Sequence, residues 1–283
     1  RQAVQKTFPD KRVVWLPNGV DSARFTRGDG ARFRQAYDIP AERRILLNVS
    51  RIDPQKNQLA LVEALQQLQA TRNDLHLVLI GPETSKRYAA RLHSEIGQRG
   101  LSSRVTVIPG LPGDSEELLD AYQAASIFCL ASRHEPFGIV ILEAWAAGLP
   151  VVAANVGGIP GFTRDGVDVL LAEPDIPSTF TTAINSLVAR PEQAARLVRA
   201  VDDYSDTHVL HQGQEAFVGI PFPEGVVDLH ELRPVFLCGR FERIEGAGPI
   251  VRETAVTYPA FLLPRANRFH VNARVAQVVD LHQ

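Results

Sequence analysis

The chain of 283 residues is long enough for one large domain or two smaller ones, each with an ample hydrophobic core. Charged residues make up 22% of it and its net charge is -2, so its composition is that of an ordinary soluble globular protein and predicts neither nucleic acid nor an anionic membrane as the main partner. Cys129 and Cys238 stand far apart in apolar runs, which favours buried free thiols in a reducing compartment and no metal site. No apolar run reaches membrane-spanning length and the N-terminus does not resemble a signal peptide, so we expect a cytoplasmic protein.

The chain begins at Arg1 and contains no methionine, so we expect a processed piece or a fragment of a longer protein. Residues 13–16 are apolar and predict a short strand. An Asn-Gly turn follows at residues 18–19, and residues 31–37 are expected to form a short helix.

From Ile45 onward, short apolar runs alternate with stretches of helical periodicity. The expected strands are 45–49, 75–80, 105–108, 127–130, 151–154 and 169–172. The expected helices are 57–70, 86–97, 116–125, 138–147 and 178–189. Strands that are apolar nearly throughout are buried on both faces, so the fold class is predicted as α/β, with a doubly wound, Rossmann-like parallel sheet in a first domain over residues 1–205.

After about residue 205 the pattern changes, and no long helical stretch intervenes. The expected strands there are 217–222, 234–244, 250–258 and 269–279. The last of these alternates between apolar and polar residues, which is typical of a half-exposed antiparallel strand. Residues 206–283 are therefore predicted to be a separate β-rich segment of unknown role.

Ligands of doubly wound sheets bind beyond the carboxyl ends of the strands, and polar turns follow the predicted strands at that edge. The turn at residues 50–57 places Arg51 and Lys56 directly before a helix. Two cations and a helix N-terminus suit a diphosphate. The alternative is a basic turn that is only solvated.

A second turn at the same edge, Ser132 to Gly138, leads into a helix and has Glu135 and Glu143 eight positions apart. Two carboxylates with backbone amides between them can hold a ligand with hydroxyls at both ends and anionic charge in the middle, such as a nucleotide-sugar. Alternatively, Glu135 only caps the helix and Glu143 is an exposed helix charge. His134 could contact a ligand or merely be exposed. The glycines at 157–158 do not fit GxGxxG, and no GxGxxG follows the first core strand, which argues against a dehydrogenase.

Four motifs follow one another along the chain at suitable spacings: Asn18-Gly19-Val20-Asp21, the turn at 50–57, Glu135-Pro136-Phe137-Gly138 with Glu143, and Ala147 to Val152. Together they resemble the group 1 (family 4-like) retaining glycosyltransferases of GT-B fold. The resemblance covers residues 1 to about 200, which correspond to the C-terminal, donor-binding half of such enzymes. It implies a transferase that uses a nucleotide-diphospho-sugar as co-substrate, without a further cofactor, and an unknown sugar, lipid or small-molecule acceptor.

The resemblance also implies a role for each matching residue. Arg51 and Lys56 would bind the donor diphosphate and stabilise the departing nucleotide, and Glu135 would bind sugar hydroxyls. The amides of Phe137, Gly138 and Ile139 would bind sugar and phosphate, Glu143 would bind the ribose, and the turn at Gly110 to Pro112 would lie against the base.

Retention of configuration is explained in that family by front-face attack, in which the leaving phosphate takes the acceptor proton. The sequence contains no counterpart of the N-terminal acceptor domain, so the full-length protein could include one and be peripheral to a membrane. Two alternatives stay open: a truncated or fused module that binds a nucleotide-sugar without transferring it, and a glycosidase-like use of Glu135 and Glu143 as a carboxylate pair.

Overall fold

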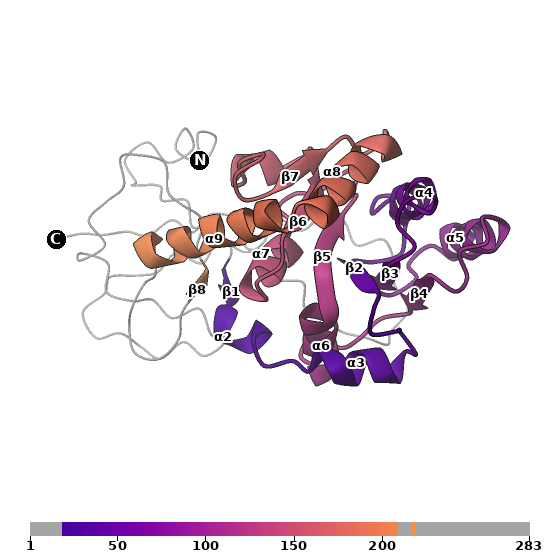
Figure 1. Cartoon of the computed structure of the whole chain (residues 1–283), viewed down its shortest axis with the longest axis horizontal. Coiled ribbons are helices and arrows are strands. Elements are labelled where there is room, and N and C mark those ends of the chain that lie inside the picture. The colour runs from indigo at the N-terminus through magenta and orange to yellow at the C-terminus, as the bar shows by residue number, and fades with distance from the viewer. Residues whose placement is uncertain (1–18, 209–216, 219–283) are drawn as a thin grey trace, which may run out of the picture. The chain divides into compact units, whose positions relative to one another are not determined.

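The structure, a computed structural model, describes residues 19–208 and 217–218. Six parallel strands form its central sheet in the order β4-β3-β2-β5-β6-β7, with helices between them along the chain (Figure 1). The strands are β2 (Arg44–Val49), β3 (Leu75–Ile80), β4 (Val105–Ile108), β5 (Ala125–Leu130), β6 (Val151–Ala154) and β7 (Leu170–Ala172). The predicted α/β doubly wound sheet is thus confirmed.

The helices follow the expected alternation closely. They are α2 (Ser22–Phe25), α3 (Gly30–Ala36), α4 (Gln58–Leu68), α5 (Lys86–Gln98), α6 (Glu116–Ala124), α7 (Ile139–Ala146), α8 (Pro177–Ala189) and α9 (Pro191–His208), with a 3-10 turn η1 (Ile159–Gly161). Ser115 caps α6 by accepting the N–H of Leu118, and Ser85 caps α5 through the N–H of Tyr88. Strand β5 begins at Ala125, directly after α6 and two residues earlier than expected.

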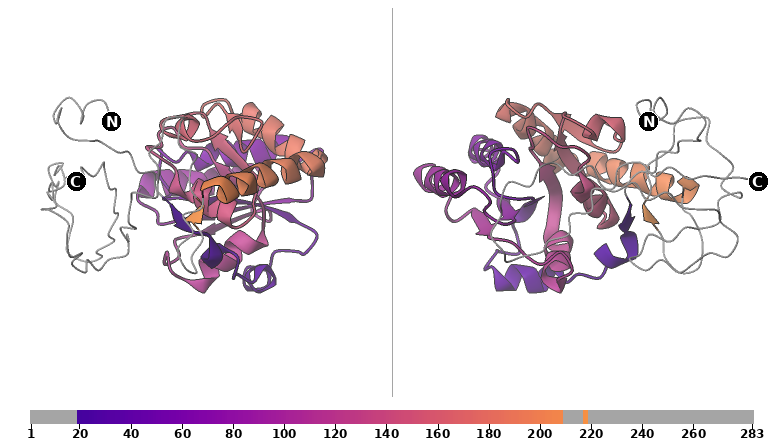
Figure 2. Two further views of the ribbon diagram at one scale, coloured as in Figure 1. Left: turned by 90° about the vertical axis from the view of Figure 1, so that its left-hand side faces the viewer. Right: turned by 180° about the vertical axis from the view of Figure 1, so that it is seen from behind.

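The sheet is buried on both faces, as its apolar strands predict. In β2, Ile45 and Leu47 belong to one hydrophobic cluster, and Leu46 belongs to a second one. Helices α3, α6 and α7 contribute to the first cluster, whereas α4, α5 and α8 contribute to the second. Helices α3 and α6 lie side by side in Figure 1 and again in the view from behind in Figure 2. Every strand therefore buries alternate side chains in opposite directions.

Helix α9 was not predicted from the sequence. The pair Arg190-Pro191 ends α8, as proline does, but Pro191 is also the first residue of α9, a position that proline favours. The helix is rich in charge and buries Leu197 and Val201. It ends at His208, past the expected boundary at residue 205, and the division into two domains stays a prediction.

Near the N-terminus the structure adds β1 (Val20–Asp21), which the sequence patterns did not predict. It pairs with β8 (Phe217–Val218) in an antiparallel ladder, Val20 opposite Val218. Strand β8 is the start of the strand expected over 217–222. The strands expected at 13–16, 234–244, 250–258 and 269–279 lie outside the described residues, as does Asn18. Among the described helices, none combines the length and the apolar character needed to cross a membrane.

The strand order reverses between β2 and β5, which are neighbours although β3 and β4 lie between them in the chain. In open α/β sheets this switch point is where ligands bind. Buried Asn48 joins the two strands at this place: its Nδ2 donates to the carbonyl of Cys129 (2.7 Å), and its Oδ1 accepts the hydroxyl of Ser50 (2.7 Å). The loops that follow β2 and β5 therefore leave the sheet side by side.

We expect Asn48→Ala to lower the free energy of unfolding by about 1–3 kcal/mol, because it removes two interior hydrogen bonds, one to the carbonyl of Cys129 and one from the hydroxyl of Ser50. Urea denaturation of both proteins measures this difference. Asn185→Ala is a control, since Asn185 is only half-buried and accepts a hydrogen bond from Arg72 on the helix surface (3.0 Å). Equal losses in the two variants would contradict a special role for Asn48 at the switch point.

Candidate functional site

Two loops meet at the switch point, residues 50–57 after β2 and residues 131–138 after β5. The backbone N–H of Arg133 donates to the carbonyl of Gln55 (2.7 Å), and the side chain of Gln55 donates to the carbonyl of His134 (3.2 Å). The Nζ of Lys56 lies 2.6 Å from Oε2 of Glu135. The two loops predicted to bind the ligand are thus joined by direct bonds, and a buried ion pair stands between them.

The Lys56–Glu135 pair is well shielded from water, with side chains 14% and 9% exposed. The hydroxyl of Ser132 donates to the same Oε2 (3.2 Å). Helix α7 has Gly138 at its N-cap position without any side-chain cap, so the alternative in which Glu135 caps the helix is wrong. Glu135 instead compensates the charge of Lys56. Because both side chains are largely shielded from water, either charge without its partner would destabilise the fold.

Asp53 organises the loop that contains the two predicted cations. Its Oδ1 accepts the N–H groups of Gln55 (2.9 Å) and Lys56 (3.2 Å). Its Oδ2 lies 3.1 Å from Nη1 of Arg51 and accepts the hydroxyl of Thr84 (3.1 Å). The loop is therefore an ordered turn, not a merely solvated one. Sequence reasoning missed Asp53, although Asp-Pro-Gln-Lys has the form of an Asx turn.

Arg51 keeps 49% of its side chain exposed while it pairs with Asp53, so part of the guanidinium faces solvent. The N-terminus of α4 is less open than the sequence suggested. The N–H of Leu59 donates to the hydroxyl of Tyr88 (3.0 Å), and that of Ala60 donates to the carbonyl of Asn57 (3.0 Å). The expectation that this helix end offers its amides to a diphosphate needs correction, because protein groups occupy these two.

The start of α7 is different. Within the described residues, the backbone N–H groups of Phe137, Gly138 and Ile139 donate to no protein acceptor. Gly138 has a φ of +91°, which favours glycine, and Ile139 is 44% exposed. Three consecutive unpaired donors, next to the side chain of Glu135, form a place for an anion or for hydroxyl oxygens.

The roles predicted for Phe137 and Pro112 belong to the backbone N–H of Phe137 and to the turn that contains Pro112, not to the two side chains. The ring of Phe137 stacks on Phe162, with 4.8 Å between centroids, so it belongs to the packing under the loop. Pro112 is exposed, and its carbonyl accepts the N–H of Ser115 in the turn before α6 (3.0 Å). His134 is also exposed.

Glu143 is half-buried on α7, and Oε2 accepts the hydroxyl of Tyr122 (2.7 Å). Burial raises the pKa of Glu143, while the hydrogen bond from Tyr122 and the charge of Arg24 act to lower it. The alternative in which Glu143 is an exposed helix charge is therefore wrong. Arg24 itself donates to the carbonyl of Gly113, so it lies between Glu143 and the turn that includes Pro112. Sequence patterns gave no sign of Arg24 or Tyr122.

Gly157 and Gly158 press on the backbone of the Glu135 loop. A Cβ on Gly157 would lie 2.1 Å from the carbonyl oxygen of Glu135, and one on Gly158 would lie 2.1 Å from that of Pro136. The N–H of Gly158 donates to the carbonyl of Glu135 (2.9 Å). These glycines support the loop because no side chain fits there.

Comparison with known proteins agrees with this geometry. The family model described as "Glycosyl transferases group 1" matches residues 29–203. The chain belongs to the group 1 glycosyltransferases. It is 35% identical over 197 residues to the D-inositol 3-phosphate glycosyltransferase of Acidothermus cellulolyticus, covering 68% of this chain and 43% of that protein. The corresponding protein of Mycolicibacterium gilvum is 38% identical over 180 residues, which cover 63% of this chain and 39% of the relative. The chain thus spans less than half the length of these relatives.

Solved structures place this glycosyltransferase chain in one half of the GT-B fold. The C-terminal domain of a group 1 family glycosyl transferase from Francisella tularensis is 25% identical, with a TM-score of 0.59, and the match covers 67% of this chain and 97% of that domain. Anabaena HepE in complex with UDP-glucose is 29% identical, with a TM-score of 0.59 over 65% of this chain and 50% of that one. The predicted resemblance to this family is confirmed, and so is the fold of the C-terminal domain of such enzymes.

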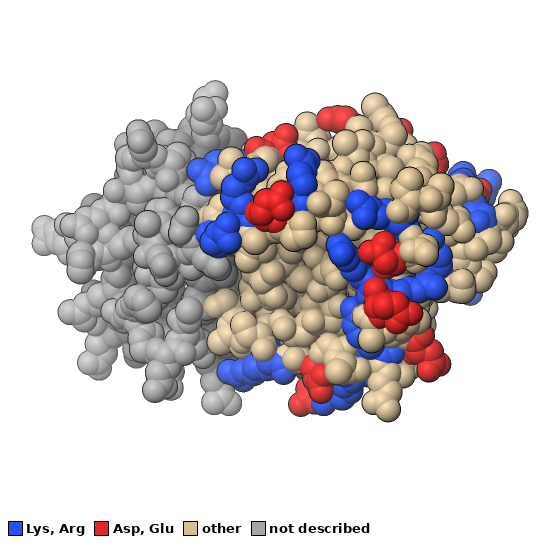
Figure 3. Space-filling view, viewed as in Figure 1, with Lys and Arg blue, Asp and Glu red and all other residues tan. Residues whose placement is uncertain are grey.

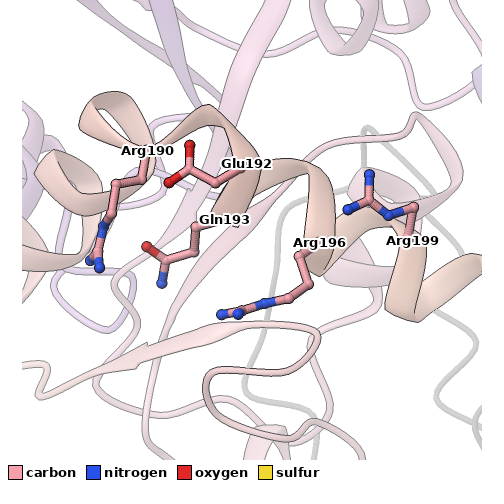
Figure 4. A pocket seen from close by; sticks show the side chains of 5 residues that line it. All are labelled: Arg190, Glu192, Gln193, Arg196 and Arg199. Carbon is pink, nitrogen blue, oxygen red and sulfur yellow. The ribbon is translucent and has the colours of Figure 1, made fainter.

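Two depressions mark the surface of this glycosyltransferase chain. A groove of about 650 Å³ includes Pro54, Asn57 and Arg133 and therefore borders the site. The other, of about 350 Å³, lies at the junction of α8 and α9, away from the switch point, and Figure 4 shows its lining of Arg190, Glu192, Gln193, Arg196 and Arg199. On the face in Figure 3, acidic and basic side chains are interspersed. In the part of the chain that the structure describes, no group of His, Cys, Asp and Glu is placed to hold a metal ion.

Gly157→Ala should displace the Glu135 loop and lower the free energy of unfolding by about 2 kcal/mol or more, because the residue has a φ of +59° and its Cβ would overlap a backbone oxygen. Thermal and urea unfolding measure this effect. Gly161→Ala is the matched control, since a Cβ there meets nothing within 4 Å. A Gly157→Ala protein as stable as the control would refute the supporting role.

Proposed function

We propose that this chain is the donor-binding half of a retaining hexosyltransferase, which transfers a sugar from a nucleotide-diphospho-sugar to a sugar, lipid or small-molecule acceptor. The observation that carries the proposal is the cluster at the switch point. There the buried Lys56–Glu135 pair lies beside the three unpaired amides of residues 137–139. A buried cation, a carboxylate and free N–H donors at one place match phosphate oxygens and sugar hydroxyls together.

Lys56 can serve Glu135 and a phosphate at the same time. An ammonium group has three N–H donors, and the ion pair at 2.6 Å uses one of them. The others are available to the diphosphate, with Arg51 as a second, more exposed cation. As the bond between sugar and phosphate breaks, negative charge grows on the leaving nucleotide. Fixed positive groups next to that charge lower the barrier to transfer.

Glu135 is then placed to accept sugar hydroxyls, because its position is fixed by Lys56, Ser132 and the glycine pair beneath its loop. The amides of Phe137, Gly138 and Ile139 bind sugar and phosphate oxygens. At the nucleoside end, Glu143 takes the ribose hydroxyls, and the turn around Pro112 lies against the base. In this assignment the ligand runs along the start of α7 from sugar to nucleoside.

A glycosidase mechanism fits this site less well. It requires one carboxylic acid that protonates the leaving group and a second carboxylate on the other side of the bond. Glu135 is ion-paired to Lys56, and Glu143 is hydrogen-bonded to Tyr122. Neither is arranged as a proton donor facing the other. Front-face transfer, in which a phosphate oxygen takes the acceptor proton, needs no such pair.

The direct test is donor binding by calorimetry, followed by a search for transfer or hydrolysis. UDP-glucose is the first donor to test because HepE was crystallised with it, and GDP-glucose and ADP-glucose complete the set. Binding together with transfer or hydrolysis would support the proposal in full. Binding alone would favour a module that holds a nucleotide-sugar without transferring it. Absence of binding to all three would refute both.

Lys56→Ala should weaken binding of the preferred nucleoside diphosphate by about 1.5–3 kcal/mol, the usual range for a hydrogen bond to a charged group. Titration calorimetry with the diphosphate alone measures this loss without any contribution from the sugar. Lys86→Ala is the control, because Lys86 is an exposed lysine at the start of α5.

The same change leaves Glu135 buried without a partner, so a second variant separates the two effects. Lys56→Ala combined with Glu135→Ala removes the unpaired carboxylate. If Lys56 binds the phosphates, the double variant stays weak. Recovery of wild-type affinity in the double variant would show that Lys56 acts only on Glu135 and would contradict its role at the diphosphate.

A further inference from the structure

Tyr122 is a tyrosine with no exposed surface, placed on α6 under the helix that contains Glu143. Its hydroxyl donates to Oε2 of Glu143 at 2.7 Å. We propose that Tyr122 is a positioning residue, which holds the carboxylate of Glu143 in the orientation and the charged state that bind the ribose hydroxyls of the donor. This inference rests on the proposed function, because it assigns a support to one residue of that site.

The packing around Tyr122 does not require a hydroxyl. Its ring meets Phe25 edge-on, with 5.2 Å between centroids, and stacks on Phe128 at 5.9 Å. A phenylalanine would make the same ring contacts without burying a polar atom. A buried hydroxyl is costly unless it is hydrogen-bonded. The hydrogen bond to Glu143 therefore offsets the cost of burying the Tyr122 hydroxyl.

The carboxylate has capacity left for a ligand. Within the described residues, Tyr122 donates to Oε2, and no protein donor reaches Oε1 of Glu143. An ionised carboxylate offers about four lone-pair positions on its two oxygens. One of them fixes the group to α6, and the others can accept the adjacent 2′ and 3′ hydroxyls of a ribose. Tyr122 thus orients the carboxylate of Glu143 without blocking the oxygen positions that accept the ribose hydroxyls.

Few charged groups face Glu143 from the elements packed against α7. Helix α2 contributes Arg24, and β1 ends at Asp21, whose carboxylate accepts the backbone N–H of Arg24. Strands β6 and β8 contain no titratable residue, and β5 contains only Cys129, which lies in the cluster on the other face of the sheet. The ionised form of Glu143 therefore depends on Tyr122 and Arg24, against the burial that raises its pKa.

The experiment compares Tyr122→Phe with the wild-type protein, using whichever of UDP, GDP and ADP binds the wild type most tightly. The same nucleotide in its 2′-deoxy form and inorganic pyrophosphate are measured alongside. We expect Tyr122→Phe to weaken the ribonucleotide about three- to tenfold, as for one net hydrogen bond, and to reduce the preference for ribose over deoxyribose. Pyrophosphate, which has no ribose, should bind as before.

A pH series supplies a second readout. Ribose binding needs the ionised carboxylate, so affinity falls as the pH drops through the pKa of Glu143 in the nucleotide-free protein. Loss of the hydrogen bond from Tyr122 disfavours the charged form, so this fall should occur at higher pH in Tyr122→Phe. In Glu143→Gln, which cannot ionise, the step should disappear.

Tyr37→Phe is the matched control, because Tyr37 also donates its hydroxyl to a carboxylate, that of Glu117, away from the site. It should leave both readouts unchanged. An equal loss of all three ligands in Tyr122→Phe, or no change in ribose preference and pH profile, would overturn the positioning role and leave the proposed function standing. If the wild type binds none of the three nucleotides, the proposed function fails, and this inference fails with it.

Discussion

The buried ion pair between Lys56 and Glu135 is the contact on which the rest of the site depends. Each partner comes from a different loop at the point where the strand order reverses, so the pair forms only when β2 and β5 are neighbours. Removing one partner of such a pair typically costs about 3–5 kcal/mol, since the other charge remains buried and uncompensated. The two loops are therefore held to one arrangement before any ligand arrives, and the cost of ordering them is met during folding.

Contacts on both sides of this ion pair also fix the two loops that contain it. Asp53 accepts two backbone N–H groups of its own loop and also pairs with Arg51. On the other side, Gly157 and Gly158 allow a third loop to press directly on the backbone of Glu135. Neither support has to touch the ligand. Both restrict where the ammonium and the carboxylate can lie, and a site that acts through fixed charges gains most from such restriction.

The sequence predicted the sheet and the two main loops because those features depend on local patterns. Apolar runs specify buried strands, and polar turns after them specify the edge where ligands bind. Gly157 and Tyr122 escaped prediction because their roles come from contacts with residues distant in the chain, whereas Asp53 escaped although most of its contacts are local ones within its own turn. Helix α9 escaped for a local reason, since Pro191 can either end one helix or begin another. Resemblance to a family supplied the roles of Arg51, Lys56 and Glu135, which spacing alone left open.

The two carboxylates of the site are balanced in different ways, and this difference has a consequence for recognition. Glu135 faces a full positive charge on Lys56, whereas Glu143 receives a hydrogen bond from a neutral hydroxyl and the weaker influence of Arg24. A neutral donor stabilises an anion less than a paired cation does, and burial raises the pKa of Glu143. If Glu143 binds the ribose as proposed, recognition of the nucleoside depends on pH through this carboxylate. The proposed diphosphate end of the site is instead held by the two cations Lys56 and Arg51, and it is also the end where negative charge develops during transfer.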